Sequence, residues 1–338
     1  MSADPQIGAA GLTGGTRELA GAGSQPAGGE SEALARLEQL LPVPPAGQVW
    51  FGDDAAVVAV PGSRDGSGST KRLLLASDCL VAGMDADLRL TSLADLGWKA
   101  MAVNLSDIAA MGGRPSYALV SVVGLKRPEL EELYSGILEA ASRYACPVVG
   151  GDLSGGHEGV VSVAVVGWVD GAPVLRNGAS AGDAIWVTGE LGAAAAGLRL
   201  LKEGGSVARS SPLARAHARP VPHLVEGEVA RAMGATAMID VSDGLTADLG
   251  KLAASSGVGF ELSRAELPIA RGATLEEALG GGDDYVLVLT ARRRHDVAGA
   301  FYAAGLPPPY MIGTCTGVSS EHLLDGRPLP ALGWEHEL

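Results

Sequence analysis

The sequence predicts an α/β protein with two domains. Three observations lead to this prediction: the chain has 338 residues, 47% of them are hydrophobic, and short apolar β-like segments alternate with longer segments of helical periodicity. A chain of this length can bury a large core and exceeds the usual size of one domain. We expect a flexible tail over residues 1–30, an N-terminal domain over 31–170 and a C-terminal α/β domain over 171–338.

The elements expected before residue 170 follow from the spacing of apolar residues. The tail is rich in Gly, Ala and Ser and has few large apolar groups, a composition typical of flexible segments. After the tail, helices are expected at Ser31–Leu41, Leu93–Met111 and Arg127–Tyr144. The expected strands are Ala55–Val60, Arg72–Ser77, Tyr117–Val123, Pro147–Val149 and Val160–Val169.

The second part starts near Pro173 and repeats the alternation of strands and helices. Strands are expected at Ala184–Thr188, Ala237–Val241 and Tyr285–Leu289, and helices at Ala193–Leu201 and Leu245–Ala254. The residues between Leu201 and Pro222 include glycines, serines and prolines, which predict a loop on the surface.

Asp107 is the residue that points most strongly to function. If Leu93–Met111 is a helix, Asp107 lies in the middle of its apolar stripe. The other members of this stripe are Leu96, Ala100, Val103 and Met111. An unpaired carboxylate buried there would cost several kcal/mol or more. Asp107 is therefore protonated, hydrogen-bonded, bound to a metal, or paired with Lys99 or Arg114.

Further carboxylates occur in short runs, mostly beside glycine, near the ends of apolar segments. These runs are Gly52-Asp53-Asp54, Ser77-Asp78, Gly150-Gly151-Asp152, Asp240-Val241-Ser242-Asp243-Gly244 and Gly281-Gly282-Asp283-Asp284. Taken singly, each run is compatible with a turn, and Ser242 or Asp243 with the cap of a following helix. Together, they supply the oxygen ligands that hard cations such as Mg²⁺ require. The joint pattern predicts a phosphate site that holds several metal ions.

Composition narrows the classes of function. The formal charge of −14, from 25 basic and 39 acidic residues, argues against general nucleic-acid binding, which needs a basic face. With only five lysines, the chain needs bound metal ions to neutralise a phosphate ligand. The three cysteines lack the spacing of a zinc or redox site, which fits a reducing cytoplasm. No apolar run reaches the roughly 18 residues of a membrane span, so we expect a soluble protein.

The familiar nucleotide-binding motifs are missing or incomplete. Residues 66–71 lack the spaced glycine and the Gly-Lys-Ser/Thr ending of a P-loop, which excludes a P-loop kinase. The run Gly189-Glu190-Leu191-Gly192 follows an expected strand without completing the dinucleotide fingerprint, so packing at a helix terminus explains it better. Any nucleotide site must therefore be built differently.

Several motifs, in order along the chain, resemble one known family. The longest is Asp95-Leu-Gly-Trp-Lys-Ala-Met-Ala-Val-Asn-Leu-Ser-Asp-Ile-Ala-Ala-Met-Gly112, whose second half is the most discriminating part. The others are Gly52-Asp-Asp-Ala-Ala-Val57, Ser77-Asp78, Gly150-Gly-Asp152, Ser242-Asp-Gly-Leu245 and Gly282-Asp-Asp-Tyr285. Over about residues 32–338, the chain resembles the thiamine-monophosphate kinases.

The resemblance implies a two-domain fold like that of aminoimidazole ribonucleotide synthetase. Its N-terminal domain would bind ATP and metal and would pair with its copy in a homodimer through a sheet or barrel. The implied reaction is direct in-line transfer of a phosphoryl group from ATP to thiamine monophosphate, which gives ADP and thiamine diphosphate. Several Mg²⁺ ions would act as cofactors, with ATP as co-substrate, because metal ions can clamp the reacting phosphates.

The resemblance also implies roles for individual residues. The metal-site residues would be Asp54, Ser77, Asp78, Asp107, Asp152, Asp240 and Asp243, with Asp53 as a neighbour. The nucleotide contacts would be Tyr134, Gly151, Asp152, Arg176 and Ser242. The substrate contacts would be Asp85, Asp283 and Trp334. Among all of these, the catalytic group would be Asp107, Asp152 and Asp243.

The chain departs from the family pattern at four positions. Asp85 stands where His is common, Asp283 where Glu is frequent, Leu153 where Thr is common, and Ala76 replaces a possible hydroxyl ligand. The substrate is therefore less constrained than the use of ATP and metal. Two alternatives stay open: another ATP-using enzyme of the superfamily, such as aminoimidazole ribonucleotide synthetase, and a non-catalytic nucleotide sensor. Selenophosphate synthetase is disfavoured because no cysteine precedes Cys79.

Overall fold

The computed structural model describes residues 30–64, 70–204, 210–330 and 332–334. Residues 42–334 belong to one compact unit, and helix α1 (Glu30–Glu38) belongs to another. The tail expected over residues 1–30 lies outside the described residues except for its last position. Across the described residues, no helix combines the length and the apolar character that crossing a membrane requires.

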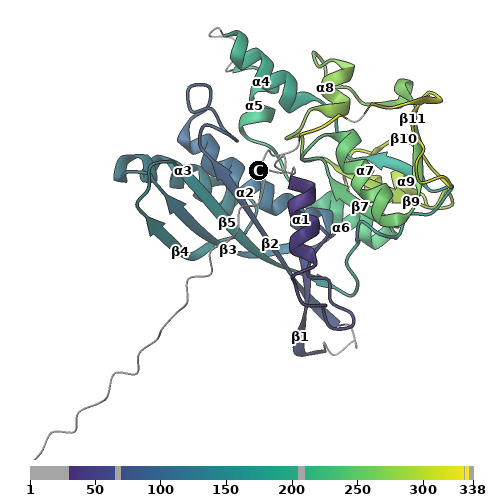
Figure 1. Ribbon diagram of the computed structural model, residues 1–338, viewed down its shortest axis with the longest axis horizontal. Coiled ribbons are helices and arrows are strands. Elements are labelled where there is room, and N and C mark those ends of the chain that lie inside the picture. Colours follow the sequence, from purple (N-terminus) through teal and green to yellow (C-terminus); the bar gives the residue numbers. More distant parts are fainter. Residues whose placement is uncertain (1–29, 65–69, 205–209, 331, 335–338) are drawn as a thin grey trace, which may run out of the picture. The chain divides into compact units, whose positions relative to one another are not determined.

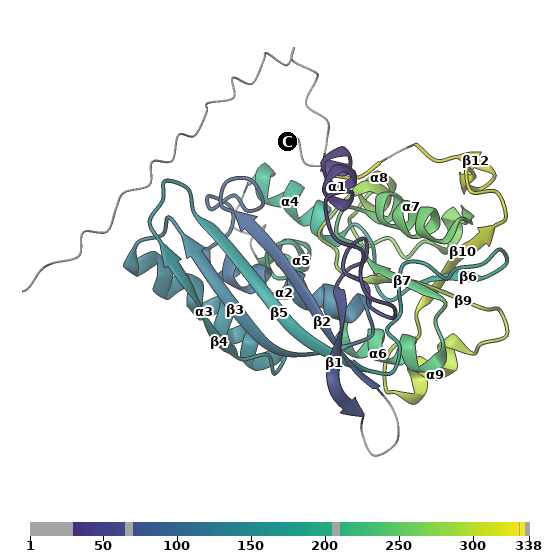
Figure 2. The ribbon, with the colours of Figure 1, turned by 60° about the horizontal axis from the view of Figure 1, so that its bottom comes forward.

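The first sheet has the spatial strand order β1, β2, β5, β3, β4. Its strands are β1 (Ala56–Arg64), β2 (Thr70–Val81), β5 (Val160–Asp170), β3 (Arg114–Val123) and β4 (Val148–Ser154). Neighbouring strands are antiparallel except β3 and β4, which are parallel. Helices α2 (Leu93–Ala110) and α3 (Arg127–Arg143) lie on one face of this sheet (Figure 1). Figure 2 shows the opposite face, with β2, β5 and β3 in front.

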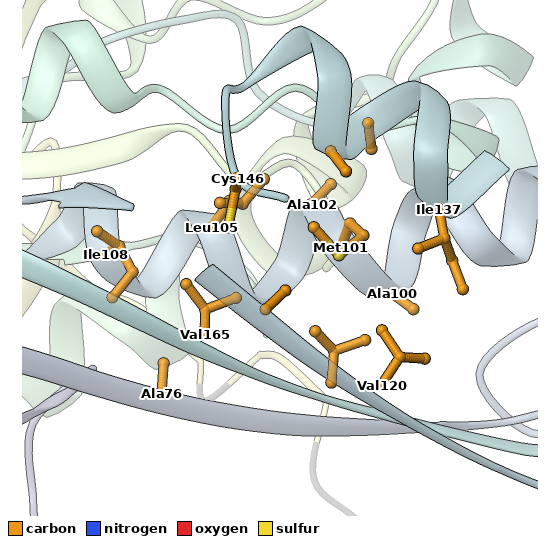
Figure 3. Close-up of a cluster of buried hydrophobic side chains, with 14 of the residues drawn as sticks. Ala76, Ala100, Met101, Ala102, Leu105, Ile108, Val120, Ile137, Cys146 and Val165 are labelled. Atoms are coloured by element: carbon orange, nitrogen blue, oxygen red, sulfur yellow. The ribbon is translucent and has the colours of Figure 1, made fainter. Parts of the chain in front are cut away.

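The core of this half lies between the sheet and α2. Figure 3 shows Met101, Leu105 and Ile108 of α2 on the same side of the sheet as Val120 and Val165. All five side chains are buried. Full burial of such a side chain contributes about 1.5–3 kcal/mol to stability. This packing fixes α2 against the strands, and with it every polar residue that α2 carries.

Helix α2 is buried on nearly all sides, which differs from the single apolar stripe that the sequence predicts. The helix begins at a capping box, in which Ser92 Oγ accepts from the backbone N of Asp95 (3.1 Å) and the Asp95 carboxylate accepts from the backbone N of Ser92 (3.2 Å). The sheet packs on one side, and α3 and α6 (Leu224–Met233) pack on others. Polar residues in α2 must therefore find partners inside the protein.

The second sheet has the spatial strand order β12, β11, β8, β10, β6, β9, β7. Its strands are β12 (Arg327–Pro328), β11 (His322–Leu324), β8 (Gly259–Leu262), β10 (Tyr310–Thr316), β6 (Ala184–Val187), β9 (Leu287–Ala291) and β7 (Ala237–Asp240). The other helices are α4 (Ala193–Glu203), α5 (Pro212–Ala218), α7 (Leu245–Ser256), η2 (Arg264–Glu266), α8 (Leu275–Gly280) and α9 (Val297–Ala303). A second core cluster, which includes Ile185, Ile239, Leu249 and Phe260, fills this half.

Two local predictions were wrong. The loop expected between Leu201 and Pro222 contains α5, which Ser211 caps and which buries Ala214 and His217. Seven residues are too few for an apolar period to be recognised. Strand β9 begins at Leu287 rather than Tyr285, because Asp283 and Tyr285 have left-handed backbone angles of φ 70° and 51°. The domain boundaries expected at residues 30 and 170 stay a prediction.

Candidate active site

Three carboxylates from distant parts of the chain meet in one cluster. Oxygen atoms of Asp54, Asp107 and Asp240 lie within 4.8 Å of one another. Asp54 lies two residues before β1, Asp107 lies in the last turn of α2, and Asp240 is the last residue of β7. The cluster therefore joins the two sheets through α2. It brings together three of the residues that the family resemblance implies as metal ligands.

The cluster has an electrostatic problem. Burial raises the pKa of the Asp107 carboxyl well above its usual range, and the nearby charges of Asp78, Asp240 and Asp54 raise it further. The pKa of Asp240 is also raised well above its usual range, first by burial and then by Asp54. Carboxylates held this close resist ionising together. A cation among them would remove the repulsion, and an all-oxygen donor set suits Mg²⁺.

Arg176 supplies one positive charge to this cluster. Its guanidinium donates to both oxygens of Asp54, with Nη2 at 2.7 Å from Oδ1 and Nε at 3.3 Å from Oδ2. Its backbone N donates to Asp53 Oδ2 (3.2 Å), although burial still raises the pKa of Asp53 to about 6. The forked donor that the sequence assigns to a nucleotide phosphate is thus held by Asp54. One arginine does not balance the three carboxylates of the cluster.

Two polar residues of α2 support the cluster, and the sequence analysis missed both. Ser106 Oγ donates to Asp240 Oδ2 (2.6 Å), and Asn104 Oδ1 accepts from the backbone N of Asp78 (2.9 Å). Both are fully buried. Their signal was present in the sequence, because Asn and Ser inside an apolar helix require hydrogen-bond partners.

Asp243 has a cation of its own in this structure. Lys251 of α7 donates to Asp243 Oδ2 and to Asp248 Oδ1, the second at 2.8 Å. Asp248 also accepts from the backbone N of Asp243 (2.9 Å), and burial raises its pKa to about 6. Neither Asp248 nor Lys251 was predicted as a site residue from the sequence. Their spacing of three residues on a helix is the signal that would have paired them.

Two of the three residues expected to contact substrate meet at Lys99. Lys99 Nζ donates to Asp283 Oδ2 (2.7 Å) and to the backbone O of Asp85 (3.3 Å). Tyr285 Oη donates to the other oxygen of Asp283 (3.1 Å). Trp334, the third of these residues, has an exposed side chain. Lys99 is therefore not the partner of Asp107 that the sequence analysis left open.

The run from Gly281 to Tyr285 lies against the segment that follows Asp240. The backbone N of Asp283 donates to Ser242 O (2.8 Å), and the backbone N of Tyr285 donates to Val241 O (2.8 Å). A Cβ at Gly282 would lie 2.5 Å from Ser242 O, so this close approach requires glycine. Trp334 joins the same region, because its backbone N donates to Asp243 O (3.0 Å).

Comparisons with known proteins show the family of this chain. The family model described as AIR synthase related protein, N-terminal domain, matches residues 52–169, and the corresponding C-terminal domain model matches residues 180–325. A thiamine-monophosphate kinase of Rhodopirellula baltica is 38% identical over 275 residues, which cover 77% of this chain and 81% of the relative. The chain belongs to the thiamine-monophosphate kinase family. The family member from Mycobacterium tuberculosis is 37% identical over 316 residues, or 91% of each chain.

A solved structure of the family has the same fold. The structure of AaThiL complexed with AMPPCP and TMP superimposes with a TM-score of 0.78 at 31% identity, and the match covers 91% of this chain and 97% of that one. The fold like that of aminoimidazole ribonucleotide synthetase, which the resemblance implies, is thus confirmed.

Some residues that the family resemblance implies lie apart from the cluster. Gly151 and Asp152 lie on β4, an edge strand that is three strand positions from β2, or roughly 14 Å. Asp78 shares a row of the sheet with Gly151, whereas Asp152 shares its row with Cys79. Side chains alternate between faces, so Asp152 points to the face opposite Asp78. Within one chain, Asp152 does not join the cluster.

Two further residues also lie outside the cluster. Ser77 precedes Asp78 on β2 and therefore points to the same face as Asp152. Tyr134 of α3 packs against the core of the first sheet. The assignments of Ser77, Tyr134 and Asp152 to metal and nucleotide stay predictions.

Proposed function

We propose that the protein transfers the γ-phosphoryl group of ATP to thiamine monophosphate, which gives ADP and thiamine diphosphate. The observation that carries the proposal is the cluster of Asp54, Asp107 and Asp240, whose three carboxylates share one arginine. Membership of the thiamine-monophosphate kinase family supports the substrate, and AMPPCP, an ATP analogue, occupies a solved relative together with TMP.

The donor set of the cluster fits magnesium. Asp54, Asp107 and Asp240 would hold the metal, with Asp78 and Asp243 as neighbouring carboxylates. When bound, Mg²⁺ ions would neutralise the phosphate oxygens and clamp the transferring group in line. The raised pKa values of Asp107 and Asp240 support this fit, because a site crowded with carboxylates binds cations in place of protons.

The side chains of the chain itself would position and balance charge. Arg176 orients Asp54, and Ser106 fixes one oxygen of Asp240, so both carboxylates are held before ligands arrive. The acceptor is a phosphate, which is already deprotonated near neutral pH, so the reaction needs no strong general base. Most of the rate enhancement would then come from positioning and from electrostatic stabilisation.

We further propose that the protein acts as a homodimer through the open face of the first sheet. This face carries the exposed side chains of Leu75, Tyr117 and Leu119, an apolar patch that a second copy would cover. Asp152 lies on the same face, on an edge strand away from the cluster of its own chain. In a dimer, Asp152 would complete the nucleotide site of the facing copy.

Mixing two inactive variants tests the shared site. Asp107→Asn and Asp152→Asn proteins, each with little activity alone, should regain about a quarter of wild-type activity after co-refolding, because half of the dimers are mixed and each mixed dimer has one intact site. Activity that stays absent in the mixture, with mixed dimers shown by mass spectrometry, would place Asp152 in the site of its own chain or outside it.

The reaction itself is tested with the purified full chain, Mg²⁺, ATP and thiamine monophosphate. Thiamine diphosphate and ADP should form in equal amounts. Nucleotide binding without either product would indicate a sensor. ADP formation only with a purine-pathway substrate would indicate an enzyme of the aminoimidazole ribonucleotide synthetase type.

A further inference from the structure

Lys99 is a buried lysine to which the proposed function gives no role. Its side chain is only 5% exposed, and it projects from the middle of α2. A buried ammonium group needs a compensating partner. Asp283 is that partner at 2.7 Å, and the backbone O of Asp85 accepts a second hydrogen bond at 3.3 Å. Lys99 thus ties together two residues expected to contact substrate.

Lys99 is the charge that orients Asp283. The neighbouring His217 has its Nδ1 at 3.7 Å from Asp283 Oδ2, too far for a good hydrogen bond. Burial and, to a smaller extent, the charge of Lys99 lower the pKa of His217 to about 4, so this ring is neutral near pH 7. The remaining partner, Tyr285, donates a neutral hydrogen bond.

The backbone around Asp283 is held in an unfavourable conformation. Asp283 and Tyr285 both have positive φ, and for a residue as bulky as Tyr this is a rare state that the surrounding structure must enforce. Backbone hydrogen bonds to Val241 and Ser242 hold the main chain. Lys99 is the contact that holds the carboxylate of Asp283 from the α2 side.

The described structure leaves little room for a ligand beside Lys99. A cavity of about 10 Å³ lies beside it, lined among others by Asp85, Asp95 and His217. A space of this size holds one water molecule at most. The Asp283 side chain, in contrast, is 29% exposed, and its carboxylate retains lone pairs for a further donor. Lys99 is therefore placed to act through Asp283.

We propose that Lys99 is a positioning residue, which holds Asp283 so that its carboxylate accepts a hydrogen bond from the amino-substituted heterocycle of the substrate. The proposal rests on the proposed function. It predicts that Lys99 affects the binding of thiamine monophosphate and leaves the nucleotide side unchanged.

A double-mutant cycle tests the proposal on the full chain. Lys99→Met and Asp283→Asn should each raise KM for thiamine monophosphate by tenfold or more, with KM for ATP changed less than twofold. The double variant should bind substrate no more than twofold worse than Asp283→Asn, because the lysine has nothing left to position. Arg114→Met is the control. It removes the ion pair between Arg114 of β3 and Glu228 of α6, away from Lys99, and should leave both KM values unchanged.

Other outcomes would overturn the proposal. If the two single effects multiply in the double variant, Lys99 acts through another group. If Lys99→Met leaves KM for thiamine monophosphate unchanged while the wild type turns over, Lys99 has no positioning role. If the wild type forms no thiamine diphosphate, the proposed function fails, and this proposal fails with it. If Lys99→Met is unstable, KM for thiamine monophosphate is compared between Asp283→Asn and the double variant. A difference of more than twofold between these two variants would overturn the proposal.

Discussion

The two carboxylate sites beside α2 differ in how their buried negative charge is compensated. At one site, Asp54, Asp107 and Asp240 share the single charge of Arg176, and the pKa values of two of them are raised well above their usual range. At the other site, Asp283 has Lys99 as its own cation at 2.7 Å. Among the described residues, the first site has more negative than positive charge and suits metal ions. The second is already balanced and suits an organic ligand.

One helix positions both sites. Asp107 and Lys99 are eight residues apart on α2, or roughly 12 Å along its axis. Because α2 is packed on nearly all sides, neither side chain can shift without disturbing the core. A substrate with a phosphate at one end and a heterocycle at the other could contact both sites at once.

The largest expected effect comes from removing charge at the metal site. Asp107→Asn keeps the shape of the side chain but removes a ligand charge, so kcat should fall by roughly a thousandfold or more with the protein still folded. Steady-state kinetics with saturating Mg²⁺ measures this change. Asp296→Asn is a matched control, because Asn caps a helix as well as Asp and α9 lies outside both sites. Unchanged activity of Asp107→Asn would remove the metal site from the account.

A moderate effect is expected in the pH dependence of stability. Because the folded pKa of Asp107 and Asp240 lies above the unfolded value of about 3.9, the folded protein binds more protons above that pH. Without metal, the free energy of unfolding contributed by these groups should fall as pH rises above about 4. Mg²⁺ should therefore raise Tm more at pH 7.5 than at pH 5.5.

The same argument predicts the sign of a mutation in metal-free protein. At pH 7.5 in EDTA, Asp107→Asn should raise Tm by roughly 1–2 °C for each kcal/mol of repulsion that it relieves, given a chain of 338 residues. Scanning calorimetry of both proteins gives the comparison. A lower Tm for the variant would show that the carboxylates do not repel one another in the folded protein.

The smallest effect is expected at Asp284, next to Asp283. The Asp284 carboxylate accepts from the backbone N of Gly192 and of Ala194 (3.1 Å), so it caps the start of α4 and does not face Lys99. Asp284→Asn should cost about 1 kcal/mol of stability and leave KM for thiamine monophosphate within threefold. An increase in KM as large as that of Asp283→Asn would show that Asp284 also acts in substrate binding.

The sequence could predict the residues of the carboxylate cluster because their signals are local. Asp54, Asp107 and Asp240 each occur in a recognisable acidic run or apolar helix, and a shared ligand explains all three. The elements around them could be predicted for the same reason, since strands and long helices have clear periods. The short helix α5 was missed because about two helical turns are too few to show a clear period.

Partners that are far apart in the chain could not be predicted. Lys99 and Asp283 are 184 positions apart, and Arg176 and Asp54 are 122 apart, so no local pattern connects either pair. For Asp152, the acidic run is easily recognised in the sequence, but the direction of the side chain is not. Only the register of β4 reveals that Asp152 points away from the cluster.

The most direct test is anomalous diffraction from crystals of the full chain grown with Mn²⁺ in place of Mg²⁺. We expect a strong anomalous peak within roughly 2.0–2.4 Å of carboxylate oxygens of Asp54, Asp107 and Asp240, and none beside Asp283. A peak at Asp283, or an empty cluster at saturating Mn²⁺, would contradict the division of the two sites into a metal site and a site for the organic ligand.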